Sequence, residues 1–361
     1  MLFEGSLTAH NRFCNFLCML LRENAKARGC MNILAIKREI LIGGQAVIEG
    51  VMIRTSSAYA VVCRKPDGSI AHKAEIIPRW CEKYKFLSLP LVRGCTTLLQ
   101  SMAIGIKAFN FSATVFEENS TDQKTKKSEQ ESNVAFTVIF AILFNILLLI
   151  VVPFLLASSL FINFDWCGLS GVKNFPLSGV SSNSYLWQIK PSSWLLFNLL
   201  DGIFRAMFFL LMIFLMSISS DIKRIFQYHG AEHKTVSVWE KGLNLTIENA
   251  KREPRQHPRC GTSFLALAII VSAILYLPIS FDSTWMNLLA RIVLLPVVVG
   301  VSFEMLWYAS KKESGLMLSV LILPGIWLQK ITTQEPDEKQ LEVAIFSLKK
   351  SLELENQEIS F

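Results

Sequence analysis

Two histidines and a glutamate stand within five residues of one another in the stretch Tyr228-His229-Gly230-Ala231-Glu232-His233. Residues four apart on a helix project from the same face, so His229 and His233 would present both imidazole rings to one metal ion. The order His-x-x-Glu-His is the inverted form of a zinc-hydrolase motif, in which the glutamate accepts a proton from a metal-activated water. The pattern therefore predicts Glu232 as a catalytic base.

A second pair of metal-type ligands follows in the stretch His257-Pro258-Arg259-Cys260-Gly261. Together with the two upstream histidines, His257 and Cys260 would complete a tetrahedral site for a divalent metal, which we expect to be zinc. A site closed in this way would be structural, because catalysis needs an open position for water. A third interpretation needs no metal: residues 257–260 would cap a helix that starts near Thr262, and Cys260 would be a small buried thiol.

The local sequence argues against a long helix around the two upstream histidines. Gly230 lowers the helix propensity, and the run Thr235-Val236-Ser237-Val238 favours extended structure. We therefore predict a short helix or none at this place. A β-hairpin is predicted directly after it, with strands at 234–240 and 243–247 that turn at Lys241-Gly242.

Composition places the chain among integral membrane proteins, since 52% of its 361 residues are hydrophobic and only 18% are charged. The formal net charge of +7 is assigned to cytoplasmic loops. Nucleic acid is not expected as a partner, because no basic patch accompanies a recognition motif or stacking aromatic residues. The eight cysteines lack the paired spacing of a secreted scaffold, which indicates reduced thiols on a cytosolic side.

Residues 1–39 are interpreted as an N-terminal extension. They contain an apolar patch at 13–21 that is too short to cross a membrane. Translation that starts at Met31 is one alternative, and an organelle transit peptide is another, although Glu4 and Glu23 count against it.

Residues 40–116 are predicted to form a cytoplasmic α/β region. Two runs of β-forming residues, 58–64 and 69–77, flank Lys65-Pro66-Asp67-Gly68, in which proline and glycine favour a tight turn. We expect a β-hairpin here, and it could share one sheet with the hairpin predicted at 234–247.

The rest of this region is predicted to be helical. Residues 86–112 are apolar but interrupted by Arg93 and Lys107, which favours an amphipathic helix on the membrane surface. The following polar tract, 117–133, is interpreted as a linker.

Four apolar segments are near the length of about 20 residues that a bilayer requires. They form two transmembrane hairpins, 134–219 and 262–304, on either side of a His/Cys loop at 220–261. The four spans are 134–161, 193–219, 262–280 and 285–303. A shorter apolar run, 315–328, contains Pro324-Gly325 and is interpreted as a re-entrant or buried helix in the C-terminal region 305–361.

The distribution of lysine and arginine predicts the orientation. The loop 163–191 holds two such residues, whereas 220–261 holds eight. The His/Cys loop and both termini are therefore expected on the cytoplasmic side, or on the stromal side in a plastid or thylakoid membrane.

Charged residues inside predicted spans are functional candidates, because they are costly in lipid. Asp201 and Arg205 lie four apart, and an internal ion pair is the simplest interpretation. Arg291 would pair with a neighbour or extend to the interface. Glu304 would either reach the His/Cys loop as a ligand or base, or act as an ordinary interfacial carboxylate.

Several long motifs resemble the YqhQ-like family of bacterial and plastid membrane proteins, over about residues 40–353. They occur in the family's order and are Gly43-Gly44-Gln45-Ala46-Val47-Ile48-Glu49-Gly50-Val51-Met52, Arg64-Lys65-Pro66-Asp67-Gly68, Gln227-Tyr228-His229-Gly230-Ala231-Glu232-His233-Lys234-Thr235, His257-Pro258-Arg259-Cys260-Gly261-Thr262-Ser263-Phe264, Pro324-Gly325-Ile326-Trp327-Leu328-Gln329 and Glu335-Pro336-Asp337. The resemblance implies a protein of unknown substrate that is described as a metal-dependent enzyme. The matching residues of chemical interest are Glu49, His229, Glu232, His233, His257 and Cys260.

We therefore predict an integral membrane α-helical bundle of about four spans plus one short re-entrant or buried helix, with a cytoplasmic α/β portion that contains two β-hairpins. The favoured function is metal-dependent hydrolysis of a lipid-linked or membrane-protein substrate. The alternatives are a non-enzymatic scaffold or assembly factor with a structural metal, and a small transporter. A bacterial inner membrane or a plastid membrane would house the protein, as a single copy or a homo-oligomer.

The predicted site residues have separate roles. Glu232 and Glu49 are the catalytic candidates, and the metal ligands are His229, His233, His257 and Cys260. The other functional candidates are Arg259, Glu304, Asp201, Arg205, Gly43, Gly44 and Gln45.

Overall fold

The computed structural model describes residues 42–78, 80, 84–117, 139–163, 194–279, 281, 283–309 and 316–359. The chain divides into two compact units, Met1–Ile40 and Leu41–Phe361, and all the described residues belong to the second. The predicted N-terminal extension, nearly all of the polar linker and the loop between the first two predicted spans lie outside the described residues.

A four-stranded antiparallel sheet forms the first part of the described chain. Its strands are β1 (Gly43–Val47), β2 (Gly50–Arg54), β3 (Ala58–Arg64) and β4 (Ile70–Ile76), paired in sequence order. The predicted hairpin is confirmed as β3 and β4. Its turn is closed by a hydrogen bond from Lys65 N–H to the Ser69 carbonyl (2.8 Å), and Gly68 adopts a φ of +86°, which favours glycine.

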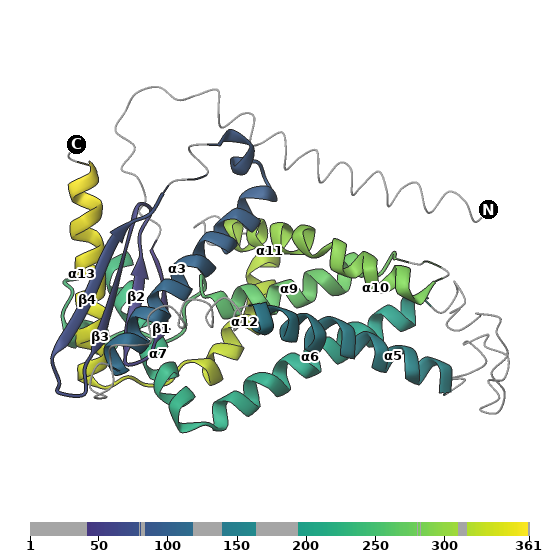
Figure 1. Cartoon of the computed structure of the whole chain (residues 1–361), viewed down its shortest axis with the longest axis horizontal. Coiled ribbons are helices and arrows are strands. Elements are labelled where there is room, and N and C mark those ends of the chain that lie inside the picture. The colour runs from purple at the N-terminus through teal and green to yellow at the C-terminus, as the bar shows by residue number, and fades with distance from the viewer. Residues whose placement is uncertain are drawn as a thin grey trace, which may run out of the picture. The chain divides into compact units, whose positions relative to one another are not determined.

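Helices cover both faces of this sheet (Figure 1). The face that carries Val61 and Cys63 packs against α3 (Val92–Glu117) through Ile104 and Ala108. The opposite face packs against α13 (Glu338–Ile359), where Ser347 Oγ donates to the Ala60 carbonyl (2.9 Å). Because both faces are buried, the residues of β2 and β3 are almost all buried rather than alternating.

The β-hairpin predicted at 234–247 is wrong, since these residues belong to helix α7 (Ser220–Glu240) and the segment after it. Gly242 has a φ of +68°, its N–H bonds to the Trp239 carbonyl (2.9 Å), and the Leu243 N–H bonds to the Val238 carbonyl (3.0 Å). These bonds form a Schellman motif, so the glycine read as a hairpin turn is a helix C-cap. The β-branched residues 235, 236 and 238 are completely buried, and this burial outweighs their low helix propensity.

Two of the described helices are long and apolar enough to cross a membrane: the continuous helical segment Ile139–Leu160 and α6 (Trp194–Ile218). The first consists of an α-helical stretch at residues 139–146, a π-helical stretch η2 (Leu147–Val151) and the greater part of α5 (Val152–Asn163). The pair α10 (Thr284–Val293) and α11 (Leu295–Ala309) adds a third if it forms one span bent by 42°. The prediction of four full spans is therefore not confirmed.

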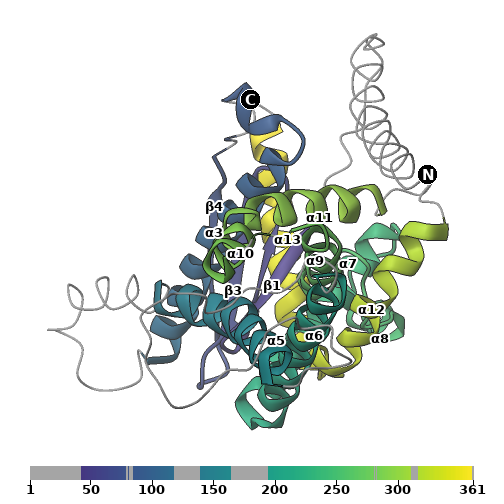
Figure 2. The same cartoon turned by 90° about the vertical axis from the view of Figure 1, so that its right-hand side faces the viewer.

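The remaining apolar helices are shorter. The predicted third span is the 16-residue helix α9 (Gly261–Tyr276), and the run interpreted as re-entrant or buried is α12 (Leu316–Thr332), which keeps Pro324 inside it. The two helices pack closely, since a Cβ on Gly325 would lie 2.5 Å from Ser263 Cα. Helices α5, α6, α9, α11 and α12 form one packed group (Figures 1 and 2).

The predicted ion pair within α6 is confirmed and belongs to a larger buried cluster. Arg205 Nη2 lies 2.7 Å from Asp201 Oδ2, and Arg291 of α10 approaches the same oxygen at 3.3 Å. Arg291 also donates to the carbonyl of Asn287 and to the side chain of Asn198. Thus Asp201 is the single carboxylate that joins two guanidinium groups between α6 and α10.

Glu304 does not reach the His/Cys loop. Its carboxylate accepts two hydrogen bonds from Arg93, one of them at 2.6 Å, and so ties α11 to the start of α3. It thus acts as a carboxylate that joins two helices.

We expect unequal effects when the two members of the α6 ion pair are neutralised. In Asp201→Asn two buried guanidinium groups lose their carboxylate, at a cost of about 3–5 kcal/mol. In Arg205→Gln the pair of Asp201 and Arg291 survives, so the loss is expected to be much smaller. Thermal unfolding of the protein in detergent measures both. Equal destabilisation would contradict the role of Asp201 as the shared carboxylate.

Candidate metal site

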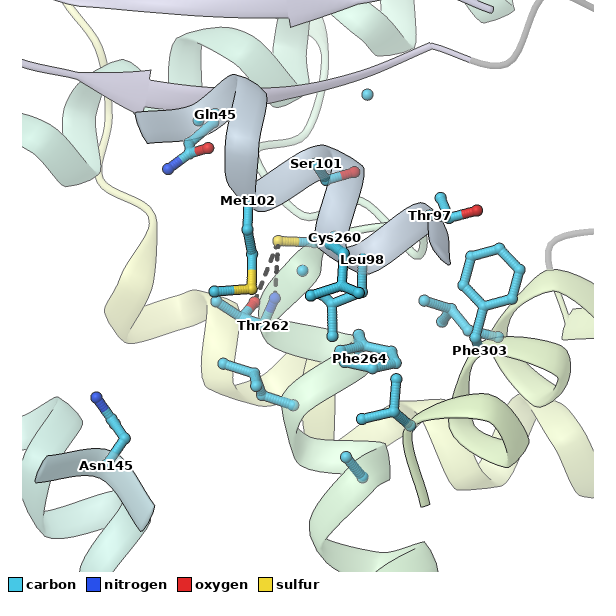
Figure 3. Close-up of a pocket in the computed structure, with 18 of the residues that line it drawn as sticks. Gln45, Thr97, Leu98, Ser101, Met102, Asn145, Cys260, Thr262, Phe264 and Phe303 are labelled. Carbon is cyan, nitrogen blue, oxygen red and sulfur yellow. Dashed lines mark hydrogen bonds between the residues drawn. The ribbon is translucent and has the colours of Figure 1, made fainter. Parts of the chain in front are cut away.

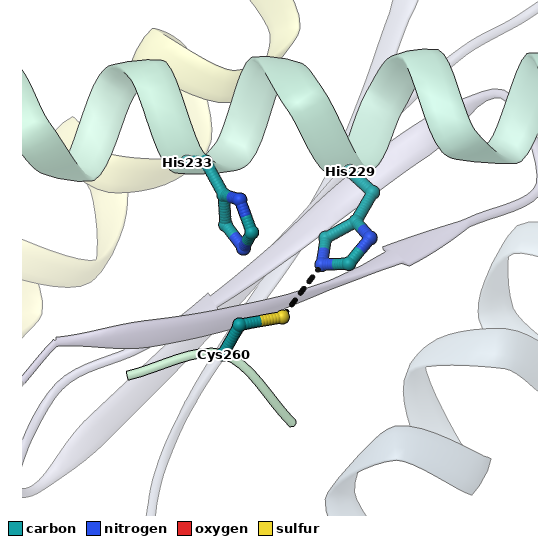
Figure 4. Close-up of side chains that lie close together, drawn as sticks. All are labelled: His229, His233 and Cys260. Carbon is teal, nitrogen blue, oxygen red and sulfur yellow. Dashed lines mark hydrogen bonds between the residues drawn. The ribbon is translucent and has the colours of Figure 1, made fainter. Parts of the chain in front are cut away.

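Helix α7 presents His229 and His233 on one face, and Cys260 faces them from the start of α9 (Figure 4). The two rings lie 4.4 Å apart between centroids, and the ligand atoms of the three residues all lie within 4.8 Å of one another. His233 and Cys260 are buried, and His229 is half-buried. A short helix or none was expected here, and the 21-residue helix α7 is what brings the two histidines together.

Backbone carbonyls determine which nitrogen of each histidine faces the cysteine. His229 Nδ1 lies 2.9 Å from the Thr332 carbonyl at the end of α12, and His233 Nδ1 lies 2.6 Å from the Arg255 carbonyl. A carbonyl oxygen only accepts, so both Nδ1 atoms must carry the proton and both Nε2 atoms keep a lone pair. Histidine ligands of metals are oriented by this type of hydrogen bond.

The cysteine sulfur completes the group. Cys260 Sγ lies 3.2 Å from His229 Nε2, and as the N-cap of α9 it accepts a hydrogen bond from the Thr262 N–H (3.5 Å). Zinc bonds of about 2.0–2.1 Å to nitrogen and 2.3 Å to sulfur place the two atoms roughly 3.6 Å apart in a tetrahedron. The donor set fits a divalent metal of this kind, with small side-chain adjustments.

His257 is not part of this group, although its ring lies 5.7 Å from that of His233 between centroids. Its Nε2 lies 3.2 Å from Glu240 Oε2 at the end of α7, and its Nδ1 accepts a hydrogen bond from the Arg259 N–H (3.3 Å). Both ring nitrogens are thus engaged by other residues. The closed set of three histidines and one cysteine that the sequence suggested is not assembled here.

Arg259 belongs to the same side network, since its guanidinium lies 3.0 Å from Glu240 Oε1. Burial is the largest influence on the pKa of Glu240 and acts to raise it, but the hydrogen bond from His257 and the charges of His257 and Arg259 together outweigh burial, so the net pKa is lowered. We call His229, His233 and Cys260 the metal-type group. The network of Glu240, His257 and Arg259 therefore holds an ionised carboxylate beside this group and positions the loop 257–260.

Glu232 lies beside the Nε2 atoms that keep a lone pair, with its Oε2 3.5 Å from His233 Nε2. Burial raises the pKa of this carboxyl, while His229, His257 and a hydrogen bond from the Gly44 N–H act in the opposite direction. Burial also lowers the pKa of His233, which favours the neutral imidazole that metals bind. A buried carboxylate with a raised pKa is suited to accept and return a proton near neutral pH.

The glycines before β2 have different roles. A Cβ on Gly44 would lie 2.6 Å from Glu232 Cγ and 2.7 Å from the Met52 carbonyl, whereas nothing lies within 4 Å of the same position on Gly43. Gln45 extends toward α3, where its Oε1 would be 2.3 Å from a Cβ on Gly105. Gly44 is thus needed because β1 crosses directly over the proposed base.

Glu49 lies outside the metal-type group. It occupies the tight turn between β1 and β2 with a φ of +49°, and its carboxylate pairs with Arg224 and accepts a hydrogen bond from Tyr228 (3.2 Å). Burial and this carboxylate raise the pKa of Tyr228. Glu49 thus ties the β1–β2 hairpin to α7, and this geometry gives a positioning role rather than the predicted catalytic one.

Gly230 has a role that sequence analysis missed. The chain after α12 crosses α7 at this residue, so a Cβ there would lie 2.2 Å from the Gln334 carbonyl, and the Gln334 N–H bonds to the Phe226 carbonyl (2.9 Å). This crossing brings the Thr332 carbonyl to His229. The sequence did show a glycine inside the motif. This glycine allows the backbone at Gln334 to pass close to α7, and it does not interrupt the helix.

A large cavity of about 2260 Å³ opens from the metal-type group. Figure 3 shows Cys260 and Thr262 at its wall, with Met102, Leu98 and Phe264 nearby. Its lining combines β1, α3, α6, α9 and α11 and is mostly apolar. An extended apolar molecule could therefore lie along these helices and reach the group.

The two glycines provide a matched test of the packing over Glu232. Gly44→Ala forces β1 or Glu232 to move, and such overpacking costs typically 1–3 kcal/mol. Gly43→Ala adds the same methyl group into open space and serves as the control. Thermal unfolding in detergent should show a clear loss for the first variant only. A loss of similar size in both would contradict the close approach.

The comparisons give this chain a family and a relative, both described without an activity. The model of the family described as "Protein of unknown function (DUF1385)" matches residues 89–354. "Uncharacterized protein YqhQ" of Bacillus subtilis (strain 168) is 33% identical over 314 residues, which cover 87% of this chain and 92% of that protein. No solved structure matches. The resemblance read from the motifs is confirmed, and the chain belongs to the DUF1385 family.

Proposed function

We propose that the protein is a metal-dependent hydrolase whose substrate is a lipid-linked or membrane-embedded molecule. His229, His233 and Cys260 would hold the divalent metal, for which zinc is the best match to the donor set. The observation that carries the proposal is that two oriented Nε2 atoms and one thiol converge beside a buried carboxylate, at the wall of an apolar cavity.

Three protein ligands correspond to the catalytic type of zinc site, which keeps a fourth position for water or substrate. A metal bound there supplies Lewis acidity and lowers the pKa of a bound water. The remaining steps belong to this chain's own residues. Glu232 Oε2 is positioned to take up a proton on the cavity side and to return it to a leaving group, and Gly44 holds that carboxylate with its N–H.

A structural metal site is the second candidate, and one observation favours it. The group joins α7 to three other parts of the fold. His229 hydrogen-bonds to the Thr332 carbonyl at the end of α12, His233 hydrogen-bonds to the Arg255 carbonyl, and Cys260 caps α9. A metal in this place would hold these elements together without chemistry, as in a scaffold or assembly factor.

Metal content distinguishes the proposed ligands from their neighbour. His229→Ala and Cys260→Ala should each lower the metal bound to purified protein well below one equivalent, because each removes one of three ligands. His257→Ala is the matched control, and it should keep close to the wild-type content since its ring is bound to Glu240. Elemental analysis by mass spectrometry measures this. Equal loss in all three variants, or no metal in the wild type, would contradict the assignment.

Glu232→Gln separates the enzyme from the scaffold. It preserves the size of the side chain and removes the base, so an enzyme should fold and keep its metal yet lose at least about a hundredfold in rate. Complementation of a deletion strain reads this out. A protein with a structural site should complement normally with Glu232→Gln, and that result would overturn the hydrolase.

A further inference from the structure

A buried cluster of charge in the apolar helices is unbalanced. Asp201, Arg205 and Arg291 are 1%, 4% and 0% exposed, and the ion pairs among them combine one carboxylate with two guanidinium groups. Among the residues that the structure describes, one positive charge of this cluster is left without a carboxylate. A buried charge without a counter-ion is strongly unfavourable, and in apolar helices such residues mark sites for ligands or ions.

The excess charge can be assigned to one residue. Arg291 donates to Asp201, to the Asn287 carbonyl and to Asn198, and its guanidinium lies 4.6 Å from the centre of the Phe154 ring. All three of its nitrogens are thus used. Arg291 is therefore satisfied within the fold.

Arg205 is held less completely. It donates to Asp201 and to Ser272 Oγ (2.9 Å), but its Nε makes no hydrogen bond with any residue that the structure describes. The same holds for Asp201 Oδ1 within the described part of the chain. The guanidinium also lies 4.9 Å from the centre of the Tyr276 ring, so the buried Nε–H is the one polar group of Arg205 that no described residue satisfies.

Arg205 also borders the large cavity, together with Ser272 and Tyr276, and Arg291 does not line it. The walls around this end are apolar and include Phe209, Leu295 and Val298. A buried charge at the wall of an apolar chamber favours a ligand with an anionic group and an apolar body. Neither a hydrated ion nor a neutral chain satisfies both features.

The cavity connects this residue with the metal-type group. Cys260 caps the start of α9, and Ser272 follows 12 residues later on the same helix, so the two ends are separated by about 18 Å along the axis. The volume of about 2260 Å³ is more than twice the upper range of roughly 1,000 Å³ for small-molecule pockets. An elongated ligand is consistent with both dimensions.

We propose that Arg205, supported by Ser272, binds the carboxylate or phosphate of a lipid whose apolar chain lies in this cavity. The anion neutralises the positive charge that Asp201 leaves uncompensated. An acidic transmembrane helix would supply the same charge. The near-complete burial of Arg205 favours a slender chain over a helix about 10 Å wide. This site does not depend on metal chemistry, and if the proposed hydrolase is correct it adds an acidic group to the substrate.

Binding of defined lipids to the full-length protein in neutral detergent tests this assignment. Displacement of radiolabelled hexadecanoate gives the affinity of hexadecanoate, hexadecyl phosphate and hexadecanol, which share one chain length. We expect at least one anion to bind about tenfold or more tightly than the alcohol, because a charge-assisted hydrogen bond is lost with the neutral head. The stronger of the two anions identifies carboxylate or phosphate as the head group.

Variants locate the site. Arg205→Gln should weaken anion binding about tenfold while the fold persists, because Asp201 and Arg291 remain as a balanced pair. Ser272→Ala should weaken anion binding by a smaller factor. This variant keeps the proposal testable if Arg205→Gln does not fold. Arg93→Gln is the matched control, since Arg93 pairs with Glu304 and does not line the cavity.

Two results would overturn the proposal: equal binding of the alcohol and the anions, or wild-type binding by Arg205→Gln. No saturable binding of hexadecanoate or hexadecyl phosphate, together with binding of a transmembrane peptide that carries a central aspartate, would instead indicate a helix partner and would also overturn it. His229→Ala should still bind the anion. Loss of metal with retained lipid binding therefore separates a failure of this site from a failure of the proposed hydrolase.

Discussion

The hydrogen bonds from His229 and His233 to two backbone carbonyls are the constraint on which the candidate site depends. They fix the proton on Nδ1 of both rings and so turn both Nε2 atoms toward Cys260. If either carbonyl moved, its ring could rotate or change tautomer and the group would no longer offer three ligands. The fold must therefore hold Thr332 and Arg255 at fixed positions relative to α7.

Two close contacts provide this precision. At Gly230 the chain after α12 passes over α7 without room for a side chain, and at Gly44 strand β1 passes over Glu232 in the same way. The sheet itself is fixed between α3 and α13, where Glu355 binds Thr55 (2.6 Å) at the start of the turn before β3. Helix α7 contacts both the sheet, through β1 and β2, and the apolar helix α6, and the proposed chemistry lies at that junction.

Features that depend on residues close together in sequence were predicted correctly. Short-range geometry is enough to predict the turn at Pro66 and Gly68, a helix in the region of α3, and the ion pair of Asp201 with Arg205. The length of helix α7 was not predicted, because its β-branched residues are buried in the fold and helix propensity does not include the effect of burial. As a whole, α7 packs against β1 and α13.

Residue types in the site were predictable, but their grouping was not. His257 is a metal-type ligand by chemistry, yet Glu240 occupies its Nε2 from a position 17 residues earlier. Every residue has a backbone carbonyl, so residue types cannot indicate which carbonyl accepts a hydrogen bond from a histidine. The roles of the Thr332 and Arg255 carbonyls therefore required the structure. Glu49 matched the motif, and its anchoring of the turn to α7 required the structure.

X-ray absorption spectroscopy of the metal-loaded protein tests the central claim most directly, because it counts the atoms bound to the ion. We expect two nitrogens at about 2.0–2.1 Å and one sulfur at about 2.3 Å, with one light atom in the fourth position. The sulfur signal should disappear in Cys260→Ser. A shell of oxygens alone, or a sulfur signal that persists in that variant, would contradict the site.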